Sequence, residues 1–577
     1  MTRLCLCPAL FIALFITLLI ATPMDVVCAQ EAGRHSSSAS GSQGAVAAGR
    51  PVSVDAGMQI LKRGGNAIDA AVATLLAQTV TESSKFCFGG EVSILIYDAR
   101  RDVVEVLSGQ GTAPKLATFD YFLNYRNETI PGSDPAAAAV PAVLHVCLTA
   151  LDRYGSLTFA QVAQPMLRAL DRDEPRWSAD LARTIRQVMQ AEREAPDDRQ
   201  RGLQLAQDYF YRGPVAHALD RWSRAHQGLI RYDDLAAHTT RFEVPVAIKY
   251  HGYTIYKCGP WTQGPYLLQT LRLLEGFDLK AMGHNSPQYV HVVVEAMKLA
   301  LADRDTFYGD PQFIDVPLES LLMTKYAALR RPLIDLRRAS HQQRPGNPHA
   351  MKPLLNVAPQ DYKLAGKPDA ASIPGGTIMR DVAATQAIND TTTCLVSDQW
   401  GNVVAATPSG WGGVLAGQTG VQLGSRLISL NSWKGHPNCI EPGKRPRITL
   451  TPTLVSKDGL PALAISVAGG DLQDQTTLQV LLNVIEFGMD PTAAVTAPRF
   501  STAHHIGSFG QPPPQLGTLS IYDSVAASTI AELEQRGHKV HQVSGPIGQP
   551  VLLTFPTKER KKHVAGDPRA DRHVAAY

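Results

Sequence analysis

The chain has 577 residues, of which 44% are hydrophobic and 19% charged, the composition of an ordinary globular protein. Its 55 basic and 52 acidic side chains leave a net charge of +3, so charge gives no case for nucleic-acid binding. The length is enough for one large core or for two domains.

The N-terminus has the pattern of an export signal. Arg3 supplies a positive start, residues 10–21 are almost wholly apolar, and Val27-Cys28-Ala29 offers small residues for a cut after Ala29. We therefore expect a signal peptide over residues 1–29 and a periplasmic or secreted protein. The alternative is an uncleaved membrane anchor, because the apolar run approaches spanning length. No other segment is apolar enough to span a bilayer, so no stable membrane contact is expected.

The cysteines do not form a disulfide framework. Five of the eight follow the predicted cut, an odd number at scattered positions, so one bridge is possible but cannot be assigned. No pair has the spacing of zinc ligands. The sequence also has no nucleotide-binding loop and no metal-ligand cluster. We therefore expect no metal and no cofactor.

The first part of the mature chain is predicted to be mainly helical. A helix from Val54 to Arg63 would end at Gly64-Gly65, and Asn66 would cap a second helix from Ala67 to about Thr79. Residues 91–98 are predicted to be a buried strand. Further helices are expected over residues 136–154, 157–170 and 187–208, and after Ser286-Pro287.

The pattern changes in the second part of the chain. Residues 342–389 lack apolar periodicity and lead into Asp390, and such a long irregular stretch usually indicates function or disorder. A hairpin is then predicted, with strands over 393–397 and 403–407 and a turn over 399–402. Strands over 452–456 and 462–467 follow, then Gly469-Gly470 and a helix over 476–487.

The run Asp390-Thr391-Thr392-Thr393 enters the first strand of this hairpin. Its placement suggests that the protein cuts itself before Thr391, which would then carry a hydroxyl and a free amine on one residue. A threonine hydroxyl needs a base beside it, and an α-amine with a pKa of about 7.7–8.0 can serve. Taken alone, the three threonines are more typical of an ordinary strand, because threonine is β-branched.

The surrounding motifs favour the first interpretation. They are the run from Leu61 to Ala73, Gly109-Gln110-Gly111-Thr112-Ala113-Pro114, Tyr308-Gly309-Asp310-Pro311, Pro442-Gly443-Lys444-Arg445-Pro446-Arg447, Gly469-Gly470 and Gly566-Asp567-Pro568-Arg569. In this order and spacing, over nearly all of the mature chain, they resemble the γ-glutamyltranspeptidase family of N-terminal nucleophile hydrolases.

The resemblance implies a four-layer αββα sandwich, assembled from two fragments of one precursor. Residues 30–390 would form a large subunit and residues 391–577 a small subunit that carries the nucleophile, Thr391. The two subunits are expected to remain associated because both build the sheets.

The resemblance also implies roles for three further residues. Gly469 and Gly470 match the oxyanion hole, where backbone N–H groups approach the developing negative oxygen. Ser409 stands where the family has a threonine whose hydroxyl bonds the nucleophile. The alternatives are a tight turn for the glycine pair and a turn serine for Ser409.

The residues that would recognise a γ-glutamyl group depart from the family pattern. Gln110 replaces an expected arginine, Ile428 and Ser429 replace an acidic group, and Ile448-Thr449 replaces a serine pair; Trp411 replaces an asparagine. Gln110 and Thr449 remain the candidate substrate-binding residues. Gln110 lacks the charge and the bidentate fork of arginine. The short link over residues 431–442 also suggests a reduced lid and an open site.

We therefore expect an exported, self-cleaving amidohydrolase or acyltransferase that resembles γ-glutamyltransferase. It would act on a small-molecule amide or peptide through an acyl-enzyme, with transfer to water or to an amine. One alternative is an acylase for amides that are not γ-glutamyl. Another is a catalytically altered family member that acts as an exported binding protein.

Overall fold

The computed structural model describes residues 36–125, 130, 132, 134–172, 176–355, 391–410, 412–556 and 561–577. The predicted signal peptide, Asp390 and Trp411 lie outside these ranges. The described residues all belong to a compact unit, His35–Tyr577. Within them, no helix has both the length and the apolarity needed to cross a membrane.

Two seven-stranded sheets form the centre of this unit, and every pairing within each sheet is antiparallel. The first sheet has the order β19 (His573–Ala576), β2 (Ala45–Ala48), β8 (Cys394–Ser397), β9 (Val403–Ser409), β3 (Glu91–Asp98), β4 (Val103–Gly109) and β5 (Arg241–Glu243). The second has the order β1 (Ser38–Gly41), β18 (Lys562–Gly566), β17 (Gln549–Thr554), β13 (Leu460–Ala468), β12 (Thr453–Lys457), β7 (Tyr253–Lys257) and β6 (Val246–Tyr250). Smaller sheets pair β10 (Gly412–Leu415) with β11 (Gln422–Gly424), and join β14 (Phe500–Ser501), β15 (Thr518–Tyr522) and β16 (Lys539–Val543).

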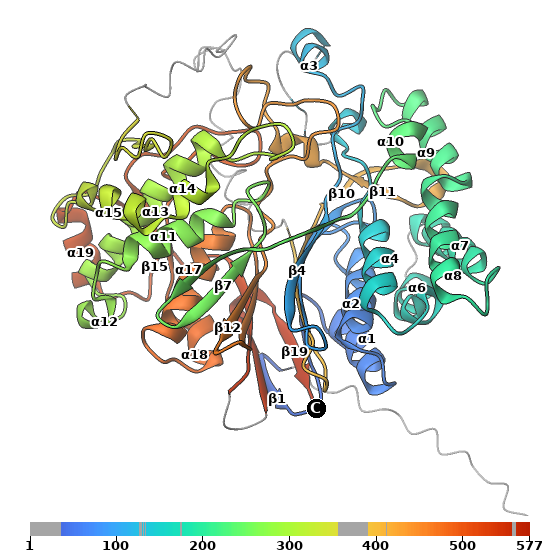
Figure 1. Cartoon of the computed structure of the whole chain (residues 1–577), viewed down its shortest axis with the longest axis horizontal. Helices are drawn as coiled ribbons and strands as arrows, with labels where there is room; N and C mark the ends of the chain where they lie inside the picture. The colour runs from blue at the N-terminus through green and yellow to red at the C-terminus, as the bar shows by residue number, and fades with distance from the viewer. Residues whose placement is uncertain are drawn as a thin grey trace, which may run out of the picture. The chain divides into compact units, whose positions relative to one another are not determined.

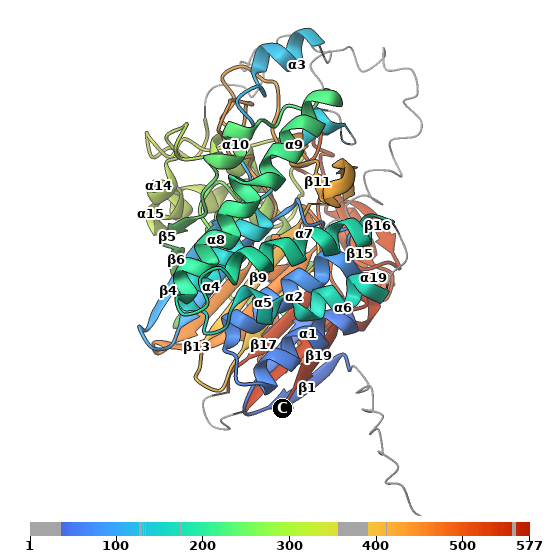
Figure 2. The same ribbon diagram turned by 90° about the vertical axis from the view of Figure 1, so that its right-hand side faces the viewer.

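Helices cover the outer face of each large sheet (Figure 1). Against the first sheet lie α1 (Pro51–Lys62), α2 (Ala67–Thr81), α4 (Val143–Tyr154), α5 (Phe159–Val162), α6 (Gln164–Arg172), α7 (Arg176–Glu192), α8 (Arg199–Tyr211) and α9 (Pro214–Ala225), which Figure 2 shows in front of the strands. The second sheet is covered by α11 (Pro265–Leu274), α13 (Pro287–Phe307), α17 (Leu472–Ile485), α18 (Pro491–Thr496) and α19 (Ala527–Gln535). Shorter helices are α3 (Phe119–Tyr125), α10 (Tyr232–Ala236), α12 (Leu279–Met282), α14 (Leu318–Leu322) and α15 (Thr324–Arg330).

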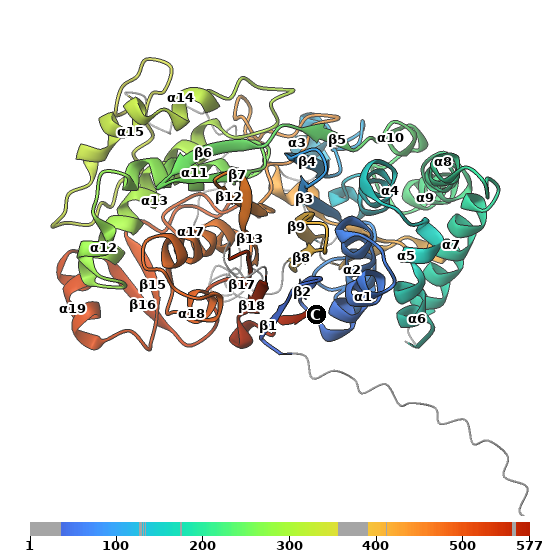
Figure 3. The same cartoon turned by 60° about the horizontal axis from the view of Figure 1, so that its bottom comes forward.

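Apolar clusters hold these layers together. One cluster lies between the first sheet and its helices, a second between the other sheet and its helices, and a third between the two sheets. Figure 3 shows the resulting order of helices, sheet, sheet and helices. This mixed α/β arrangement is consistent with the N-terminal nucleophile hydrolase sandwich that the resemblance implies.

Several predicted elements are confirmed. The Asn66 side chain accepts from the backbone N–H groups of Ile68 and Asp69 at 2.9 and 3.0 Å, so it caps α2 as predicted. The strand over residues 91–98 is β3, and the hairpin after Thr391 is β8 with β9.

Three predicted helices are wrong in their continuity, and a proline lies near each break. The predicted helix over 136–154 is an α-helix only from Val143 onward, shortly after Pro141. The stretch over 157–170 divides into α5 and α6, with Pro165 at the start of α6. The stretch over 187–208 divides into α7 and α8 around Pro196. Proline lacks the N–H group that a helix interior requires and disfavours helical geometry in the preceding residue.

Candidate active site

The register of the β8–β9 hairpin brings Thr391 opposite Ser409. Cys394 pairs with Ala406, and three residues further along each strand lie Thr391 and Ser409. The Thr391 hydroxyl donates to the Ser409 hydroxyl at 3.3 Å, and both side chains are fully buried. The Thr392 N–H donates to the carbonyl of Pro408 at 3.0 Å, which extends the pairing towards Thr391. The predicted nucleophile and its predicted supporting hydroxyl are therefore in contact.

Arg426 adds a positive charge to this pair. Its guanidinium donates to the Ser409 hydroxyl at 2.8 Å and forms an ion pair with Glu91. Glu91 lies directly across from Ser409 in the β3–β9 pairing, and both charged side chains are almost completely buried. Sequence reasoning missed Arg426 and Glu91 as site residues, because Glu91 could be interpreted as part of a buried strand and no motif marks Arg426.

Thr391 has an unusual backbone. Its φ angle is +77°, in the left-handed region that a β-branched residue rarely adopts. Such a conformation typically costs of order 1–3 kcal/mol and persists only when the surrounding structure holds it. The neighbouring residue is one such support, because the Thr392 hydroxyl accepts from Gln78 of α2 at 3.2 Å and from Arg572 at 3.1 Å.

Gly469 and Gly470 lie at the end of β13, between that strand and α17. Their φ angles are +127° and +57°, so glycine suits both positions. Their carbonyls accept from the N–H groups of Leu472 and Gln473 at 3.0 and 3.1 Å, which makes the tight turn that was the alternative interpretation.

The glycine turn faces the nucleophile strand from the second sheet. Ser466, near the end of β13, lies 3.1 Å from the Thr407 hydroxyl of β9 and donates to the Ala406 carbonyl at 2.7 Å. The two strands therefore meet across the space between the sheets. Beyond Thr407, β9 continues to Ser409, and beyond Ser466, β13 leads to Gly469 and Gly470. Ser409 and the two glycines therefore lie at the same end of the space between the sheets.

A buried ion network fixes the glycine turn. Asp471, which follows Gly470, accepts from Arg304 at 2.8 Å and from the Ser508 hydroxyl at 2.6 Å. Burial alone would raise the pKa of the Asp471 carboxyl, but His505 and Arg304 outweigh it and hold that pKa well below its usual range. Asp471 therefore stays charged and keeps the turn in place.

Gln110 lies beside this end of the first sheet but does not contact Thr391. The β3–β4 pairing of Val92 with Gly109 continues to Glu91 and Gln110, so Gln110 is a neighbour of the Arg426 ion pair. Its amide nitrogen donates to the Pro446 carbonyl at 2.5 Å, whereas its amide oxygen is buried and has no hydrogen-bond partner among the described residues. Gln110 thus offers an incoming molecule an acceptor, unlike the arginine that the family pattern leads one to expect.

The other substrate-recognition positions are also neutral. Thr449 is fully buried, and its hydroxyl lies 3.3 Å from the Gln473 side chain rather than against Thr391. The Ser429 hydroxyl accepts weakly from Arg426 at 3.5 Å, and the Ile428 carbonyl accepts from Gly510 at 3.0 Å.

The predicted open site concerns the cut enzyme and stays a prediction. Thr391, Ser409 and Thr449 are completely buried, and so is half of the 431–442 link, including Asn431 and Asn438. This link is held by backbone bonds from Asn431 to the Asn438 carbonyl and from Ile440 to the Asn431 carbonyl, at 3.0 and 2.8 Å. In the uncut chain, the short link therefore does not leave the nucleophile exposed.

Cys394 is not a competing nucleophile. Its thiol is fully buried in the cluster between β8 and the helices, and burial raises its pKa well above the usual range. A thiol with a raised pKa remains protonated and unreactive. All five cysteines of the described residues are free and buried, so none of them forms a bridge.

Comparisons with known proteins identify the family and the fold of this chain. A sequence model of the family described as Gamma-glutamyltranspeptidase matches residues 53–200 and 178–577. The glutathione hydrolase proenzyme of Bacillus subtilis strain 168 is 29% identical over 86% of this chain and 85% of its own length. The acylase ACY 1 proenzyme of Pseudomonas sp. strain V22 is 31% identical over 87% of this chain and 88% of its own. A solved structure of a cephalosporin acylase from Bacillus halodurans matches with a TM-score of 0.75 at 26% identity, over 93% of this chain and 96% of that one.

Proposed function

Because the chain belongs to the gamma-glutamyltranspeptidase family, whose relatives include glutathione hydrolase and acylase proenzymes, we propose that it is an exported proenzyme that cuts itself before Thr391. The released threonine then acts as the nucleophile of an amidohydrolase or acyltransferase. The observation that carries this proposal is the buried contact from the Thr391 hydroxyl to Ser409, which Arg426 holds from the other side.

In the proposed maturation step, the Thr391 oxygen attacks the carbonyl carbon of Asp390. The bond between that carbon and the Thr391 nitrogen breaks, and the hydroxyl proton passes to the nitrogen, which leaves an ester. Water then hydrolyses the ester to give a carboxylate on Asp390 and a free amine and hydroxyl on Thr391. The positive φ of Thr391 favours this reaction, because a residue without a preceding carbonyl has no φ to strain.

The two proposed subunits, residues 30–390 and 391–577, would remain together after the cut. The first sheet takes β2, β3, β4 and β5 from the large subunit and β8, β9 and β19 from the small one. The second sheet is mixed in the same way. Separation of the subunits would therefore break backbone pairings in both sheets and expose the apolar layer between them.

In each turnover, the α-amine of Thr391 would take the hydroxyl proton while the oxygen attacks the substrate amide. The backbone N–H groups at Gly469 and Gly470 would stabilise the negative oxygen of the tetrahedral intermediate. The amine of the substrate leaves with the proton, and an acyl ester of Thr391 remains. Water or an amine then releases the acyl group and restores the hydroxyl.

For the substrate, we favour an amide whose acyl group lacks the charged head of a γ-glutamyl group. Gln110 offers an acceptor oxygen, which would repel a carboxylate, and its amide nitrogen already donates to the Pro446 carbonyl. Ile428 and Ser429 offer no negative charge for an α-amine. Gln110 and Thr449 are the proposed contacts to a neutral acyl chain. Hydrolysis of γ-glutamyl donors such as glutathione is the second candidate, because a glutathione hydrolase proenzyme is a relative over most of the chain.

Intact mass spectrometry of the purified protein tests the maturation step. We expect a fragment that begins at Thr391 and ends at Tyr577, and Thr391→Ala should give one uncut chain. A folded wild-type protein that stays uncut would refute the self-cleaving enzyme. If the cut occurs but no amide is turned over, a binding protein becomes the better description.

Three p-nitroanilides test the substrate. The γ-glutamyl, glutaryl and butyryl compounds differ by the successive loss of the α-amine and the carboxylate. We expect the butyryl compound to have the highest kcat/KM. A clear preference for the γ-glutamyl compound would instead favour the glutathione hydrolase activity.

A further inference from the structure

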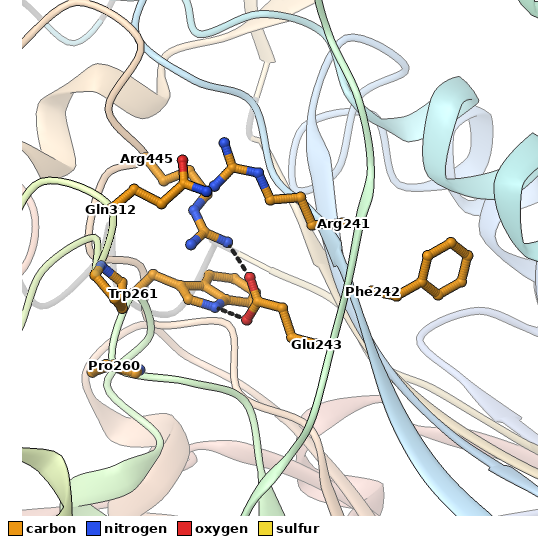
Figure 4. A pocket seen from close by; sticks show the side chains of 8 residues that line it. Arg241, Phe242, Glu243, Pro260, Trp261, Gln312 and Arg445 are labelled. Carbon is orange, nitrogen blue, oxygen red and sulfur yellow. Dashed lines mark hydrogen bonds and ion pairs between the residues drawn. The ribbon is translucent and has the colours of Figure 1, made fainter.

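A cavity lies beside β5, the outer strand of the first sheet. Its volume is about 580 Å³, within the usual range for small-ligand sites of about 300–1,000 Å³. Figure 4 shows the guanidinium groups of Arg241 and Arg445 close together, with Gln312 beside them and the Trp261 ring below. We call this space the edge cavity. Pro311 adds exposed apolar surface to its lining, whereas Pro260 and Trp261 are buried behind it.

The two carboxylates near the edge cavity are already occupied. Arg445 donates to Glu243 at 2.6 Å and to Asp310 at 2.9 Å. The second oxygen of Glu243 accepts from the Trp261 indole at 2.6 Å, and the second oxygen of Asp310 accepts from the Arg445 N–H at 3.0 Å. Neither carboxylate makes a hydrogen bond to Arg241 among the described residues.

Arg241 is therefore a cation without a close counter-ion in this part of the described chain. One of its terminal nitrogens is buried and has no hydrogen-bond partner there. Burial and the neighbouring Arg445 lower the pKa of the Arg241 guanidinium, against the smaller opposing effects of Asp310 and Glu243. A buried charged donor without a partner is costly, and an anion beside it would remove that cost.

We propose that the edge cavity binds a small organic anion that has a carboxylate and an apolar body. The Arg241 guanidinium would hold the carboxylate through its planar fork, with the Gln312 amide as a second donor. Pro311, which is exposed, would contact the apolar body.

The edge cavity is separate from the nucleophile. In the order of the first sheet, β5 lies four strands from β8, which corresponds to about 19 Å at a spacing of about 4.8 Å per strand. The anion is therefore either an independent ligand or the far end of a long amide substrate. The edge cavity is connected to the candidate active site through neighbouring residues. Arg445 lines the cavity, and the carbonyl of the next residue, Pro446, accepts a hydrogen bond from Gln110, a candidate substrate-binding residue.

Calorimetric titration of the full chain with 3-phenylpropionate tests the proposal. The alcohol 3-phenylpropanol, which has a similar shape but no charge, is the comparison ligand. We expect the wild-type protein to bind the carboxylate and not the alcohol. Arg241→Gln should weaken the binding of 3-phenylpropionate by about tenfold to a hundredfold, which is the usual contribution of a hydrogen bond to a charged group. Arg241→Lys should give an intermediate loss, because it retains the charge but not the fork.

Arg186→Gln is the matched control. Arg186 is also an arginine beside a surface hollow, but it is paired with Asp171 at 2.6 Å. This variant should bind 3-phenylpropionate as the wild type does. Arg241→Gln should retain the wild-type melting temperature without ligand, since the described Arg241 side chain makes no hydrogen bond that the change would remove. Equal binding of acid and alcohol, unchanged affinity in Arg241→Gln, or no binding to the wild type would each overturn the proposal.

Kinetics with a p-nitroanilide whose acyl chain ends in a carboxylate about 19 Å from the amide distinguish the two sources of the anion. If 3-phenylpropionate raises the KM in the wild type but not in Arg241→Gln, the cavity receives the far end of a substrate. If it binds without an effect on KM, the cavity serves an independent ligand. Inhibition that persists unchanged in Arg241→Gln would contradict the site. The binding measurement does not require turnover, so its outcome is independent of the proposed function.

Discussion

Replacing Arg426 and Glu91 together by glutamine is expected to slow both self-cleavage and turnover while the protein still folds. Arg426 donates to Ser409 at 2.8 Å, and Ser409 in turn accepts from Thr391. A hydrogen bond from a charged group is worth about 1.5–3 kcal/mol, and about 1.4 kcal/mol corresponds to a factor of ten in rate. The expected loss in either rate is therefore about tenfold to a hundredfold.

Both residues have to be replaced, because the replacement of Arg426 alone would change both the position of Ser409 and the stability of the fold. Removing Arg426 alone leaves Glu91 buried without its partner, and breaking a buried pair costs about 3–5 kcal/mol of stability. Removing both charges is often close to neutral for stability. The double variant thus separates the positioning of Ser409 from the stability of the fold.

The assay follows the uncut chain by intact mass spectrometry with time, and then kcat with the preferred p-nitroanilide. Lys298→Gln with Glu295→Gln and Arg344→Gln is the control, because this largely buried triad, in which Glu295 pairs with Lys298 at 2.7 Å and with Arg344 at 2.9 Å, lies outside the proposed site. The control should mature and turn over normally. If the Arg426 and Glu91 variant also matures and turns over at the wild-type rate, Arg426 does not position Ser409 and the reasoning is refuted.

Three further outcomes are expected. Thr391→Ser should still be cut and should remain active, because serine supplies both a hydroxyl and an α-amine; an uncut serine variant on a denaturing gel would contradict this. Gly469→Ala should lower kcat, because alanine keeps the backbone N–H but avoids the φ of +127° and so moves that donor away from the oxyanion; complete loss of a donor costs about a hundredfold to a thousandfold, and an unchanged kcat in the folded variant would contradict the oxyanion role of Gly469. Burial lowers the pKa of His436 from 6.5 to about 4, so the neutral ring stabilises the fold above pH 6.5, and this stability is lost as the pH falls from 6.5 to 4. His436→Gln should flatten the pH dependence of denaturant unfolding in that interval, and an unchanged slope would contradict the assignment.

The contact between Thr391 and Ser409 was accessible from sequence because it is local. A tight turn over residues 399–402 joins the two strands, so the hairpin register alone brings the residues together. The cap at Asn66 was predictable for the same reason, since it depends on hydrogen bonds within three residues. The helix boundaries near Pro196 were missed because the charged pattern continues on both sides of the proline.

The Arg426 and Glu91 pair could not be derived from the sequence. Glu91 reaches Ser409 only because β3 pairs with β9 across more than three hundred residues, and sequence periodicity does not specify which distant strands become neighbours. Arg241 and Arg445 meet in the edge cavity through a similarly distant arrangement. The side chains of both pairs are charged and largely buried, whereas charged residues are usually expected at the protein surface.

The arrangement of the strands explains how the chain can fold before it is cut. Strands from both sides of residue 391 pair with one another in both sheets, so folding of the continuous chain surrounds the β8–β9 hairpin in which Thr391 and Ser409 meet. The same assembly holds Thr391 at a φ of +77°, a conformation that the unfolded chain would avoid. Folding therefore places the strain at the bond that is proposed to break, and the cut relieves it without the loss of a sheet pairing. A precursor cut at this position before folding should consequently fail to assemble, whereas one cut after folding should remain as stable as the uncut chain.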